Sequence, residues 1–483
     1  MRLEQLAAAT ATKQVTGASR GAACEITSLA YDSRKAHPGT LFFCVPGEKA
    51  DGHEFAAGAV ESGVAALVVE RELELAVPQV VVDDARAAMA PLAARFYGDP
   101  TAELRVAGIT GTNGKTTTAF LLREVLESVA VQCGLLGTVK QVVGAVEEEV
   151  ERTTPEAIDL QATFRQMLDG GDRACAMEVS SHALALHRVD AIHFELALFT
   201  NLTQDHLDFH SDMEDYFLSK RRLFADLHPG VALVNVDDPY GRRLAAEFDC
   251  LSFSAGGADA DFSAVDVTFD PAGAGFTVGG VAVRTALPGH FNVANALGAF
   301  AAAVAMGVEP PEAAEGLAAA SRVPGRLEPI DEGQGFAVLV DYAHTPDSLE
   351  NVLGAARRLT QGRVIAVFGA GGDRDRDKRP KMGRAGAEGS DLAIVTSDNP
   401  RSEDPEEIVA EVVAGVGDDS RLEVEPDRRA AIALAFERAR PGDTVVIAGK
   451  GHEQGQEFEN GRKVPFDDRE VAREELERLG GAG

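Results

Sequence analysis

The stretch LRVAGITGTNGKTT, from Leu104 to Thr117, carries the most structural information in the chain. Its apolar first half predicts a strand, its glycines predict a tight loop, and the run AFLLREVLESV that begins at Ala119 suits a helix. Strand, Gly-rich loop and helix in this order are typical of a phosphate-binding loop, because glycines let the backbone approach phosphates and the helix N-terminus presents N–H groups. We therefore expect ATP or GTP to bind here. The alternative is a Gly-rich turn that only caps a helix.

Two side chains of this loop indicate phosphate chemistry. Lys115 is placed to neutralise β- and γ-phosphate oxygens, and Thr116 is placed to ligate Mg²⁺. The loop departs from the general pattern at Ile109, which stands where the first glycine belongs.

Two residues further along are candidates for the same metal. Glu178 ends the apolar run in AMEVSSH, and His206 lies in TNLTQDHLDFH. The alternatives are a solvated carboxylate at a strand end and a polar surface loop. His206 and His210 are four residues apart, but the chain has no HExxH motif and no evident third ligand, so we do not expect zinc.

The chain divides into three α/β segments, residues 1–103, 104–325 and 326–483. The first holds the β-like runs LFFCV, AALVV and QVVVDD and a helical stretch over 85–97. The third repeats a strand-then-helix rhythm with FAVLVDY, RVIAVFG, DLAIVTS and DTVVIAG. This alternation predicts parallel sheets covered by helices, with ligands at the carboxyl ends of the strands.

Length and composition exclude several classes of protein. A chain of 483 residues suits three domains. The formal net charge of −31 argues against a nucleic-acid partner. There is no apolar run of about 18 residues, no signal-like start and no CxxC among five scattered cysteines. We expect a cytoplasmic monomer without membrane insertion.

Four loops of the third segment follow predicted strands and combine both charges. They are DYAHTP from Asp341, GAGGDRDRDKR from Gly369, DNPR from Asp398 and GKGHE from Gly449. Arginines there suit a carboxylate or phosphate, and carboxylates suit an ammonium, so we expect a zwitterionic, amino-acid-like ligand. Each loop taken singly is compatible with an ordinary turn.

Lys220 lies in DMEDYFLSKRRLF, a helical stretch with apolar residues on one face. The pattern alone favours a solvated helix lysine that pairs with Asp215 or Glu214.

Taken together, GTNGKTT, MEVSSHAL, TNLTQDHLDFH, HFNVANALGA, the Gly-Arg at Arg326 and DYAHTP resemble the Mur ligases, the ATP-dependent amide-forming enzymes of peptidoglycan precursor synthesis. The resemblance covers nearly the whole chain. It implies a small N-terminal α/β domain that binds the uridine nucleotide, a central P-loop ATPase-like α/β domain, and a C-terminal Rossmann-like α/β domain that binds the amino acid.

The resemblance also implies a reaction. It is the addition of meso-2,6-diaminopimelate to the D-Glu γ-carboxylate of UDP-N-acetylmuramoyl-L-alanyl-D-glutamate, through an acyl phosphate. The DNPR loop favours diaminopimelate, because Arg401 can pair with its distal carboxylate. Alternatives are the same ligation with L-lysine, the ligases of other steps, folylpolyglutamate synthetases, and a P-loop nucleotide-hydrolysing switch.

Site residues follow from the resemblance. The catalytic residues are Lys115, Glu178, His206 and a Lys220 carbamoylated by CO₂. Mg²⁺ is expected at Thr116, Glu178, His206 and Lys220. ATP is expected to contact Gly111, Thr112, Asn113, Gly114, Lys115, Thr116, Thr117, Asn292, Arg326 and Asp341. The nucleotide-sugar is expected at Tyr31, Ser33, Thr153, Thr154, Ser180 and Arg188, and diaminopimelate at Arg374, Asp398, Asn399, Pro400, Arg401, Gly449 and Glu453. Arg152 and Leu186 depart from some family members, which have Asn and Gln at these positions.

Overall fold

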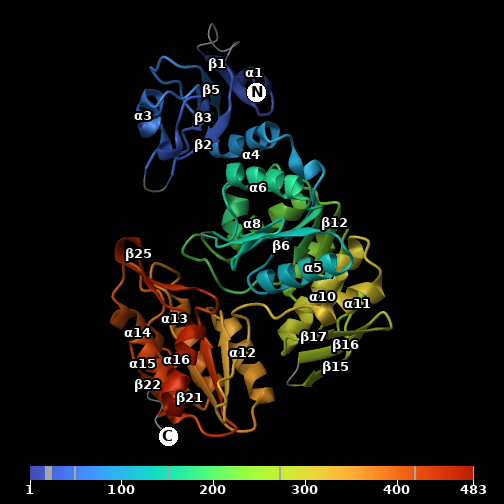
Figure 1. Cartoon of the computed structure of the whole chain (residues 1–483), viewed down its shortest axis with the longest axis vertical. Helices are drawn as coiled ribbons and strands as arrows, with labels where there is room; N and C mark the ends of the chain where they lie inside the picture. Colours follow the sequence, from blue (N-terminus) through green and yellow to red (C-terminus); the bar gives the residue numbers. More distant parts are fainter. Residues whose placement is uncertain (17–23, 48–49, 151, 271–272, 418–419, 482–483) are drawn as a thin grey trace. The chain divides into compact units, whose positions relative to one another are not determined.

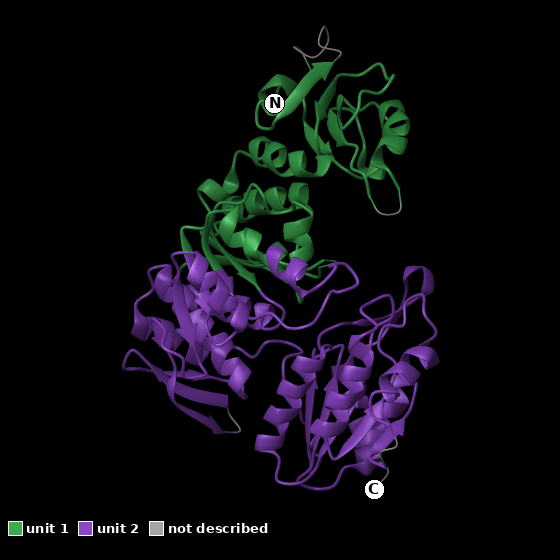
Figure 2. Cartoon of the chain, turned by 180° about the vertical axis from the view of Figure 1, so that it is seen from behind, with its two compact units in different colours: residues 1–110, 131–197, 219–231 green, residues 111–130, 198–218, 232–483 purple. Residues whose placement is uncertain are grey.

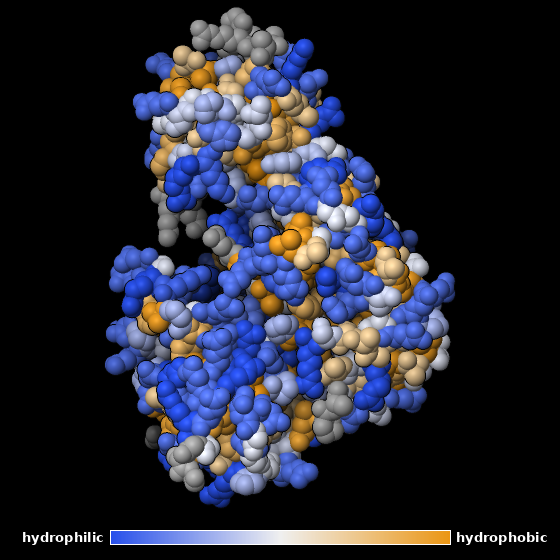
Figure 3. Space-filling model, in the orientation of Figure 1, coloured by the Kyte–Doolittle hydropathy of each residue, from blue (hydrophilic) through white to orange (hydrophobic). Residues whose placement is uncertain are grey.

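A computed structural model describes residues 1–16, 24–47, 50–150, 152–270, 273–417 and 420–481 (Figure 1). The chain forms two compact units: residues 1–110, 131–197 and 219–231 make the first, and residues 111–130, 198–218 and 232–483 the second (Figure 2). No helix within the described ranges is long and apolar enough to cross a membrane. Hydrophilic side chains cover most of the face seen in Figure 3, in keeping with the high net charge.

The N-terminal sheet has the order β1-β5-β4-β3-β2. Its strands are β1 (Thr12–Thr16), β2 (Ser28–Ala30), β3 (Thr40–Phe43), β4 (Ala66–Val69) and β5 (Gln79–Val82). The last four are parallel, as predicted, and β1 pairs antiparallel with β5 at the edge. The helical elements here are α1 (Leu3–Ala7), η1 (Ser33–Lys35), η2 (Gly52–Phe55), α3 (Ala56–Glu61), α4 (Ala85–Phe96) and η3 (Pro100–Ala102). Helix α4 confirms the helical stretch predicted over 85–97.

The central sheet has the order β14-β13-β12-β11-β6-β10-β7-β8-β9. Its strands are β6 (Arg105–Thr110), β7 (Cys133–Leu136), β8 (Gln141–Val143), β9 (Val146–Glu148), β10 (Ala174–Glu178), β11 (Phe194–Phe199), β12 (Val231–Asn235), β13 (Leu251–Ser254) and β14 (Phe262–Ser263). Strands β6, β10 and β7 are parallel, whereas β7, β8 and β9 form an antiparallel meander. Its helices are α5 (Lys115–Ser128), α6 (Ala157–Gly170), α7 (Ser181–Ala185), α8 (Met213–Ala225), α9 (Pro239–Glu247), α10 (His290–Ala305) and α11 (Pro310–Ala319).

The C-terminal sheet has the order β18-β19-β23-β20-β21-β22. Its strands are β18 (Glu328–Ile330), β19 (Ala337–Asp341), β20 (Val364–Phe368), β21 (Leu392–Val395), β22 (Leu422–Val424) and β23 (Thr444–Ala448). All but β18 run parallel. Helices α12 (Pro346–Leu359), α13 (Lys378–Gly389) and α14 (Pro405–Val413) cover one face, and α15 (Arg428–Arg438) and α16 (Asp468–Gly481) the other.

Burial on both faces explains the continuous apolar strands of this sheet. Leu339 and Phe368 pack in the core beneath α12 and α13, while their neighbours Val340 and Val367 pack in the core beneath α15 and α16. Strands buried on two sides read as uninterrupted hydrophobic runs. The predicted parallel sheet covered by helices is therefore confirmed here.

Two small antiparallel sheets were not predicted. One consists of β15 (Val265–Asp270), β16 (Gly273–Val278) and β17 (Val281–Thr285), and the other of β24 (Gly455–Phe458) and β25 (Arg462–Pro465), joined by η4 (Glu459–Gly461). Gly279 and Gly280, both with positive φ, form the two-residue turn between β16 and β17. Such a Gly-Gly pair is a hairpin signal that the sequence does carry.

Candidate active site

The phosphate loop joins β6 to α5. Gly114 has φ +87° and caps α5; a Cβ there would lie 2.2 Å from Asn295 Oδ1. Gly111 has φ +150°, and its Cβ would lie 1.8 Å from Thr200 Oγ1. Only glycine fits both positions without strain. Lys115 Nζ donates to the carbonyls of Gly111 at 3.0 Å and Thr112 at 2.8 Å, so its ammonium lies over the loop. The ammonium and the N–H groups of the α5 N-terminus suit an anion.

Arg326 lies beside this loop. Its Nη2 donates to Thr116 Oγ1 at 3.0 Å, and its guanidinium stacks on the Tyr342 ring at 4.7 Å. The buried Nε of Arg326 has no hydrogen-bond partner among the described residues. Asp341 accepts hydrogen bonds from two backbone N–H groups; burial raises the pKa of its carboxyl, and the charge of Arg326 opposes that shift. The structure thus brings Thr116, Arg326 and Asp341 together, and the Arg326 Nε–H remains available as a donor to a ligand.

The remaining predicted nucleotide residues lie close by. Asn292 is buried on α10, donates to the Pro288 carbonyl at 2.8 Å and accepts from Asn295 Nδ2 at 3.2 Å. Asn113 Nδ2 donates to Asp347 Oδ2 at 2.8 Å. Thr117 is buried in the first turn of α5.

In the first unit, Glu178 ends β10 with a side chain only 1% exposed. Its Oε1 accepts from the Thr138 N–H at 2.7 Å and its Oε2 from the Thr138 hydroxyl at 3.1 Å. A Cβ at Gly137 would lie 2.5 Å from Oε1. Glu178 is therefore held in place rather than solvated, so the alternative of a solvated strand-end carboxylate is wrong.

The residues predicted for the nucleotide-sugar gather around Glu178. Thr153 Oγ1 lies 3.1 Å from Thr138 Oγ1, and Thr154 Oγ1 donates to the Glu178 carbonyl at 2.9 Å and accepts from the Ser180 N–H at 3.2 Å. Arg188 Nη1 donates to the Thr154 carbonyl at 3.1 Å. Four of the six predicted residues thus lie at one strand end, and their role in binding stays a prediction.

Three arginines converge on Glu156 next to this cluster. Arg188 and Arg152 lie 2.9 Å from Glu156 Oε1, and Arg86 lies 3.3 Å from Oε2. Burial lowers the pKa of Arg188, and Arg152 and Arg86 lower it further, while Glu156 raises it. Arg152, which departs from some family members, adds a cation here.

The other two nucleotide-sugar candidates lie in the N-terminal part of the first unit. Tyr31 donates to Asp159 Oδ2 at 2.7 Å, and burial, reinforced by Asp159, raises the pKa of the phenol. Ser33 opens η1 with Asp32 as its N-cap.

Lys220 is buried on α8, with 1% of its side chain exposed, and its Nζ lies 3.5 Å from Thr110 Oγ1. The alternative of a solvated surface lysine is therefore wrong. The apolar pattern alone does not place Lys220 on the buried face of α8; only the resemblance to the Mur ligases predicts a functional role for it.

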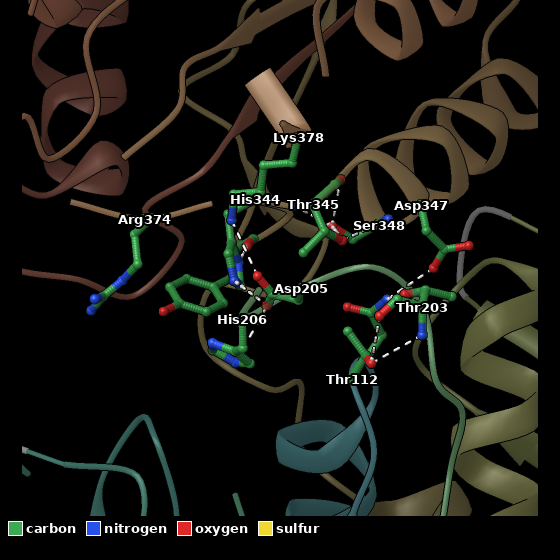
Figure 4. A network of polar contacts seen from close by, with 12 residues as sticks. Thr112, Thr203, Asp205, His206, His344, Thr345, Asp347, Ser348, Arg374 and Lys378 are labelled. Atoms are coloured by element: carbon green, nitrogen blue, oxygen red, sulfur yellow. Dashed lines mark hydrogen bonds and ion pairs between the residues drawn. The ribbon is translucent and has the colours of Figure 1, made fainter. Parts of the chain in front are cut away.

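A polar network in the second unit surrounds Asp205 (Figure 4). Lys378 Nζ lies 3.2 Å from Oδ1, and His206 and His344 lie 3.4 and 3.7 Å from Oδ2. Burial alone would raise the pKa of Asp205, but His206, Lys378 and His344 outweigh it and lower that pKa well below its ordinary value. Asp205 and Lys378 were not predicted as functional; the DH and DKR motifs were the available signal.

The four C-terminal strand-end loops do meet. Lys450, fully buried, donates to Asn399 Oδ1 at 2.8 Å and Glu453 Oε2 at 2.9 Å, and lies 3.5 Å from Asp398 Oδ1. Asn399 Nδ2 donates to Glu453 Oε2 at 2.8 Å. Gly449 has φ +127°, and a Cβ there would lie 2.7 Å from Asp398 Oδ2. The other two loops join them: Arg401 Nη1 donates to the Gly372 carbonyl at 2.7 Å, and the Tyr342 hydroxyl donates to Glu453 Oε1 at 3.5 Å. The four loops form one mixed-charge cluster at a sheet edge, with Lys450 as a cation that is not among the predicted site residues.

Two arginines at this edge were predicted to meet a ligand carboxylate. Arg401, after Pro400 and with φ +53°, donates through Nε to Glu457 Oε2 at 3.0 Å and through Nη1 to the Gly372 carbonyl at 2.7 Å. Arg374 is half-exposed and lies 3.7 Å from Asp208. Arg401 is the better fixed of the two.

The described residues contain no group of three or more His, Cys, Asp or Glu side chains that could hold a metal. Mg²⁺ usually takes one or two carboxylates and completes its shell with water and phosphate oxygens, so a single ordered carboxylate and a threonine hydroxyl fit it. Glu178 and Lys220 belong to the first unit, and Thr116 and His206 to the second. Their joint role in binding Mg²⁺ stays a prediction.

Sequence profiles of three Mur ligase domains match consecutive parts of this chain. The profile of the family's catalytic domain matches residues 25–97, the middle domain 109–303, and the glutamate ligase domain 325–451. A UDP-N-acetylmuramoyl-L-alanyl-D-glutamate--2,6-diaminopimelate ligase from Streptomyces coelicolor is 48% identical over 486 residues, covering 97% of this chain and 96% of the relative. The chain therefore belongs to the Mur ligase family and has its three-domain α/β fold.

Solved structures of other proteins support the same fold for this chain. That of a UDP-N-acetylmuramoyl-L-alanyl-D-glutamate--2,6-diaminopimelate ligase, 34% identical, matches with a TM-score of 0.68 over 95% of this chain and 96% of the other. The Mycobacterium tuberculosis folylpolyglutamate synthase complexed with ADP and AMPPCP is 18% identical and matches with a TM-score of 0.63, over 76% of this chain and 93% of the synthase. The second likeness shows a shared fold alone.

Proposed function

We propose that this protein is an ATP-dependent ligase that joins meso-2,6-diaminopimelate to the D-Glu γ-carboxylate of UDP-N-acetylmuramoyl-L-alanyl-D-glutamate, in cytoplasmic peptidoglycan precursor synthesis. The observation that carries the proposal is the 48% identity, over nearly the full length of both chains, to a ligase with that name. The geometry of the two units supplies the chemical reason for it.

A carboxylate and an ammonium do not condense at neutral pH. The γ-carboxylate therefore attacks the γ-phosphorus of ATP, ADP departs, and an acyl phosphate forms. The deprotonated amine of the amino acid then attacks the acyl carbon and expels phosphate. The first step brings two anions together, so fixed positive groups must already face the transferred phosphoryl. Lys115 and the N–H groups that begin α5 are suited to this, and Arg326 has a spare donor beside them.

Mg²⁺ and a carbamate on Lys220 are part of the proposal. Thr116, Glu178 and His206 are the residues that would hold the metal, which when bound neutralises phosphate oxygens. The burial of Lys220 suits a carbamate, because removal from water favours the neutral amine, which is the form that reacts with CO₂. Lys220 Nζ donates to the Thr110 hydroxyl at 3.5 Å. Lys115, in contrast, is committed to the phosphate loop.

The nucleotide-sugar is proposed to lie along the first unit, from Tyr31 and Ser33 to the end of β10. Thr153, Thr154 and Ser180 offer hydroxyls there, and Arg188 offers a cation. This arrangement suits an anionic, hydroxyl-rich ligand whose reacting carboxylate ends near Glu178.

The amino acid is proposed to lie at the carboxyl edge of the C-terminal sheet. Asp398 is buried, and its Oδ1 accepts no hydrogen bond from the described residues, although Lys450 Nζ lies 3.5 Å away, so it can still accept one from a ligand ammonium. Lys450 and Arg428 hold the pKa of Asp398 below its ordinary value despite burial, so it stays charged. Arg401 suits the distal carboxylate that diaminopimelate has and L-lysine lacks.

The test is phosphate release from ATP with the purified protein, Mg²⁺ and UDP-N-acetylmuramoyl-L-alanyl-D-glutamate. Turnover with meso-diaminopimelate and not with L-lysine is expected. Equal turnover with L-lysine would keep the ligase and reject the assignment of Arg401. Phosphate release that needs no amino acid would favour a nucleotide-hydrolysing switch instead. Cell fractionation and light scattering check the proposed cytoplasmic location and monomeric state.

A further inference from the structure

The loop after β11, residues 200–208, is bound to the phosphate loop on one side. The Thr112 N–H donates to the Asn201 carbonyl at 2.9 Å, and the Asn113 N–H donates to Asn201 Oδ1 at 2.9 Å. The Thr203 N–H donates to the Thr112 hydroxyl at 3.0 Å. These hydrogen bonds join the two loops, so a displacement of one loop is expected to displace the other.

The same loop is bound on its other side to the segment that leads into α13. Gln204 Nε2 donates to Asp375 Oδ2 at 2.9 Å. Lys378 Nζ donates to Asp205 Oδ1 at 3.2 Å, and both residues are labelled in Figure 4. Asp205 and Lys378 are 5% and 4% exposed. Lys381 also donates to Gln204. Gln204 and Asp205, which are adjacent in the 200–208 loop, are thus bonded to Asp375 and Lys378 of the 373–378 segment.

A purely stabilising role accounts poorly for this pair. Buried ion pairs contribute little net stability compared with packed apolar residues of similar volume, because both charges must leave water. The pair lies between the phosphate loop and the loop of Arg374, two places with proposed ligands.

We propose that Asp205 and Lys378 are positioning residues: through their ion pair, the phosphate loop holds the 373–378 loop in the arrangement that binds the amino acid. This inference rests on the proposed function and deepens it. The nucleotide and the amino acid then bind cooperatively. Because coupling between two sites is reciprocal, each ligand raises the affinity for the other by the same factor. Neither residue touches a reacting atom; both act through the loops that they join.

The experiment is calorimetric titration of meso-diaminopimelate into the full-length protein, with and without a non-hydrolysable ATP analogue and Mg²⁺. In the wild type, the analogue is expected to raise the affinity for meso-diaminopimelate about fivefold or more. In Lys378→Met and Asp205→Asn that factor falls to about one, while the affinity for the analogue alone changes by less than about twofold. Lys378→Arg, which keeps the charge, recovers part of the factor.

Arg376→Gln is the matched control. Arg376 belongs to the same segment but is 61% exposed and pairs with Glu411 on α14 instead of the 200–208 loop. It is expected to keep the wild-type factor. If Lys378→Met does not fold, Asp205→Asn carries the test, because it removes one charge of the same ion pair with little change in side-chain volume.

Each outcome bears on the inference. A factor of one in the wild type, or an unchanged factor in folded Lys378→Met or Asp205→Asn, overturns it. A variant that binds both ligands more weakly and also melts at a lower temperature overturns it too, because a residue with a purely structural role would have these effects. Phosphate release is measured alongside. Turnover with diaminopimelate and an unchanged factor rejects this inference alone, whereas no turnover with any amino acid rejects the proposed function.

Discussion

Arg401 is where the choice between two amino acids can be tested most directly. Its Nε and Nη1 are committed to Glu457 and to the Gly372 carbonyl, at 3.0 and 2.7 Å, which fixes the guanidinium plane. Nη2 of this fixed group donates no hydrogen bond to any residue that the structure describes, so it is available to the distal carboxylate of diaminopimelate. We predict that Arg401→Met loses activity with diaminopimelate and not with L-lysine, because L-lysine has no group to meet it.

The size of the loss follows from the burial of this side chain. Removing one partner of a buried, charged hydrogen bond costs about 2–5 kcal/mol. Arg401 is 21% exposed and already lies against Glu457, so screening places the loss at the lower end, about 2 kcal/mol. At about 1.4 kcal/mol for each factor of ten, kcat/KM for diaminopimelate falls about 30-fold.

The assay is phosphate release with each amino acid, for the wild type, Arg401→Met and the control Arg376→Met. The ratio of kcat/KM for diaminopimelate over L-lysine should fall about 30-fold in Arg401→Met and stay unchanged in the control, whose arginine is 61% exposed. An equal fall with both amino acids would mean a structural role, and no fall with diaminopimelate would refute the reasoning. A selective loss in Arg374→Met would move the carboxylate to that residue.

Three further predictions concern other parts of the chain. Lys220→Ala should abolish phosphate release, and added short carboxylates should restore part of it by standing in for the carbamate; no restoration would count against a carbamate. Gly114→Ala should weaken binding of an ATP analogue and cost about 1–3 kcal/mol of unfolding free energy, because φ is +87° and a side-chain oxygen lies 2.2 Å from the added Cβ. Gly58→Ala, in helix α3 with nothing within 4 Å, is the unstrained control and should be neutral or slightly stabilising, so equal melting of the two variants would contradict the strain argument. Hydrogen bonds from the buried Arg379 lower the pKa of Glu403 from 4.5 to about 2, so the charged form contributes stability that is fully present above about pH 4.5 and lost as the pH falls towards 2. Glu403→Gln should therefore lower the unfolding free energy by about 1 kcal/mol at pH 7, a figure discounted for partial exposure, and by almost nothing near pH 2; a difference that stays constant over this range in chemical denaturation would exclude the shift.

Most of the fold could be predicted from patterns among residues that are close together in the sequence. Glycines at 111 and 114, with Lys115 after them, predicted a strand, a loop and a helix, and β6 and α5 have that arrangement. Apolar runs such as FAVLVDY predicted the parallel strands of the C-terminal sheet. These signals are readable because strand, turn and helix preferences act over a few residues.

Elements at the sheet edges were harder to foresee. Strands β1 and β18 are antiparallel to their neighbours, and the sheet of β15, β16 and β17 was not predicted, although Gly279 and Gly280 mark its turn. Strands β1 and β15 contain no fully buried side chain, so the alternation of apolar and polar residues that marks a half-buried strand is weak in them. Pairing with a neighbour then fixes their direction.

The composition of the charged clusters depends on the three-dimensional arrangement. Lys378 and Asp205 are 173 positions apart, and Lys450 meets Asn399 across 51. No local pattern distinguishes these lysines from exposed ones, because burial and pairing depend on which loops the sheets bring to one edge. The sequence identified the loops and the kinds of chemistry they offer; the packing of the sheets and helices selected the partners, because the energy of a charge depends on the side chains and the water around it in space.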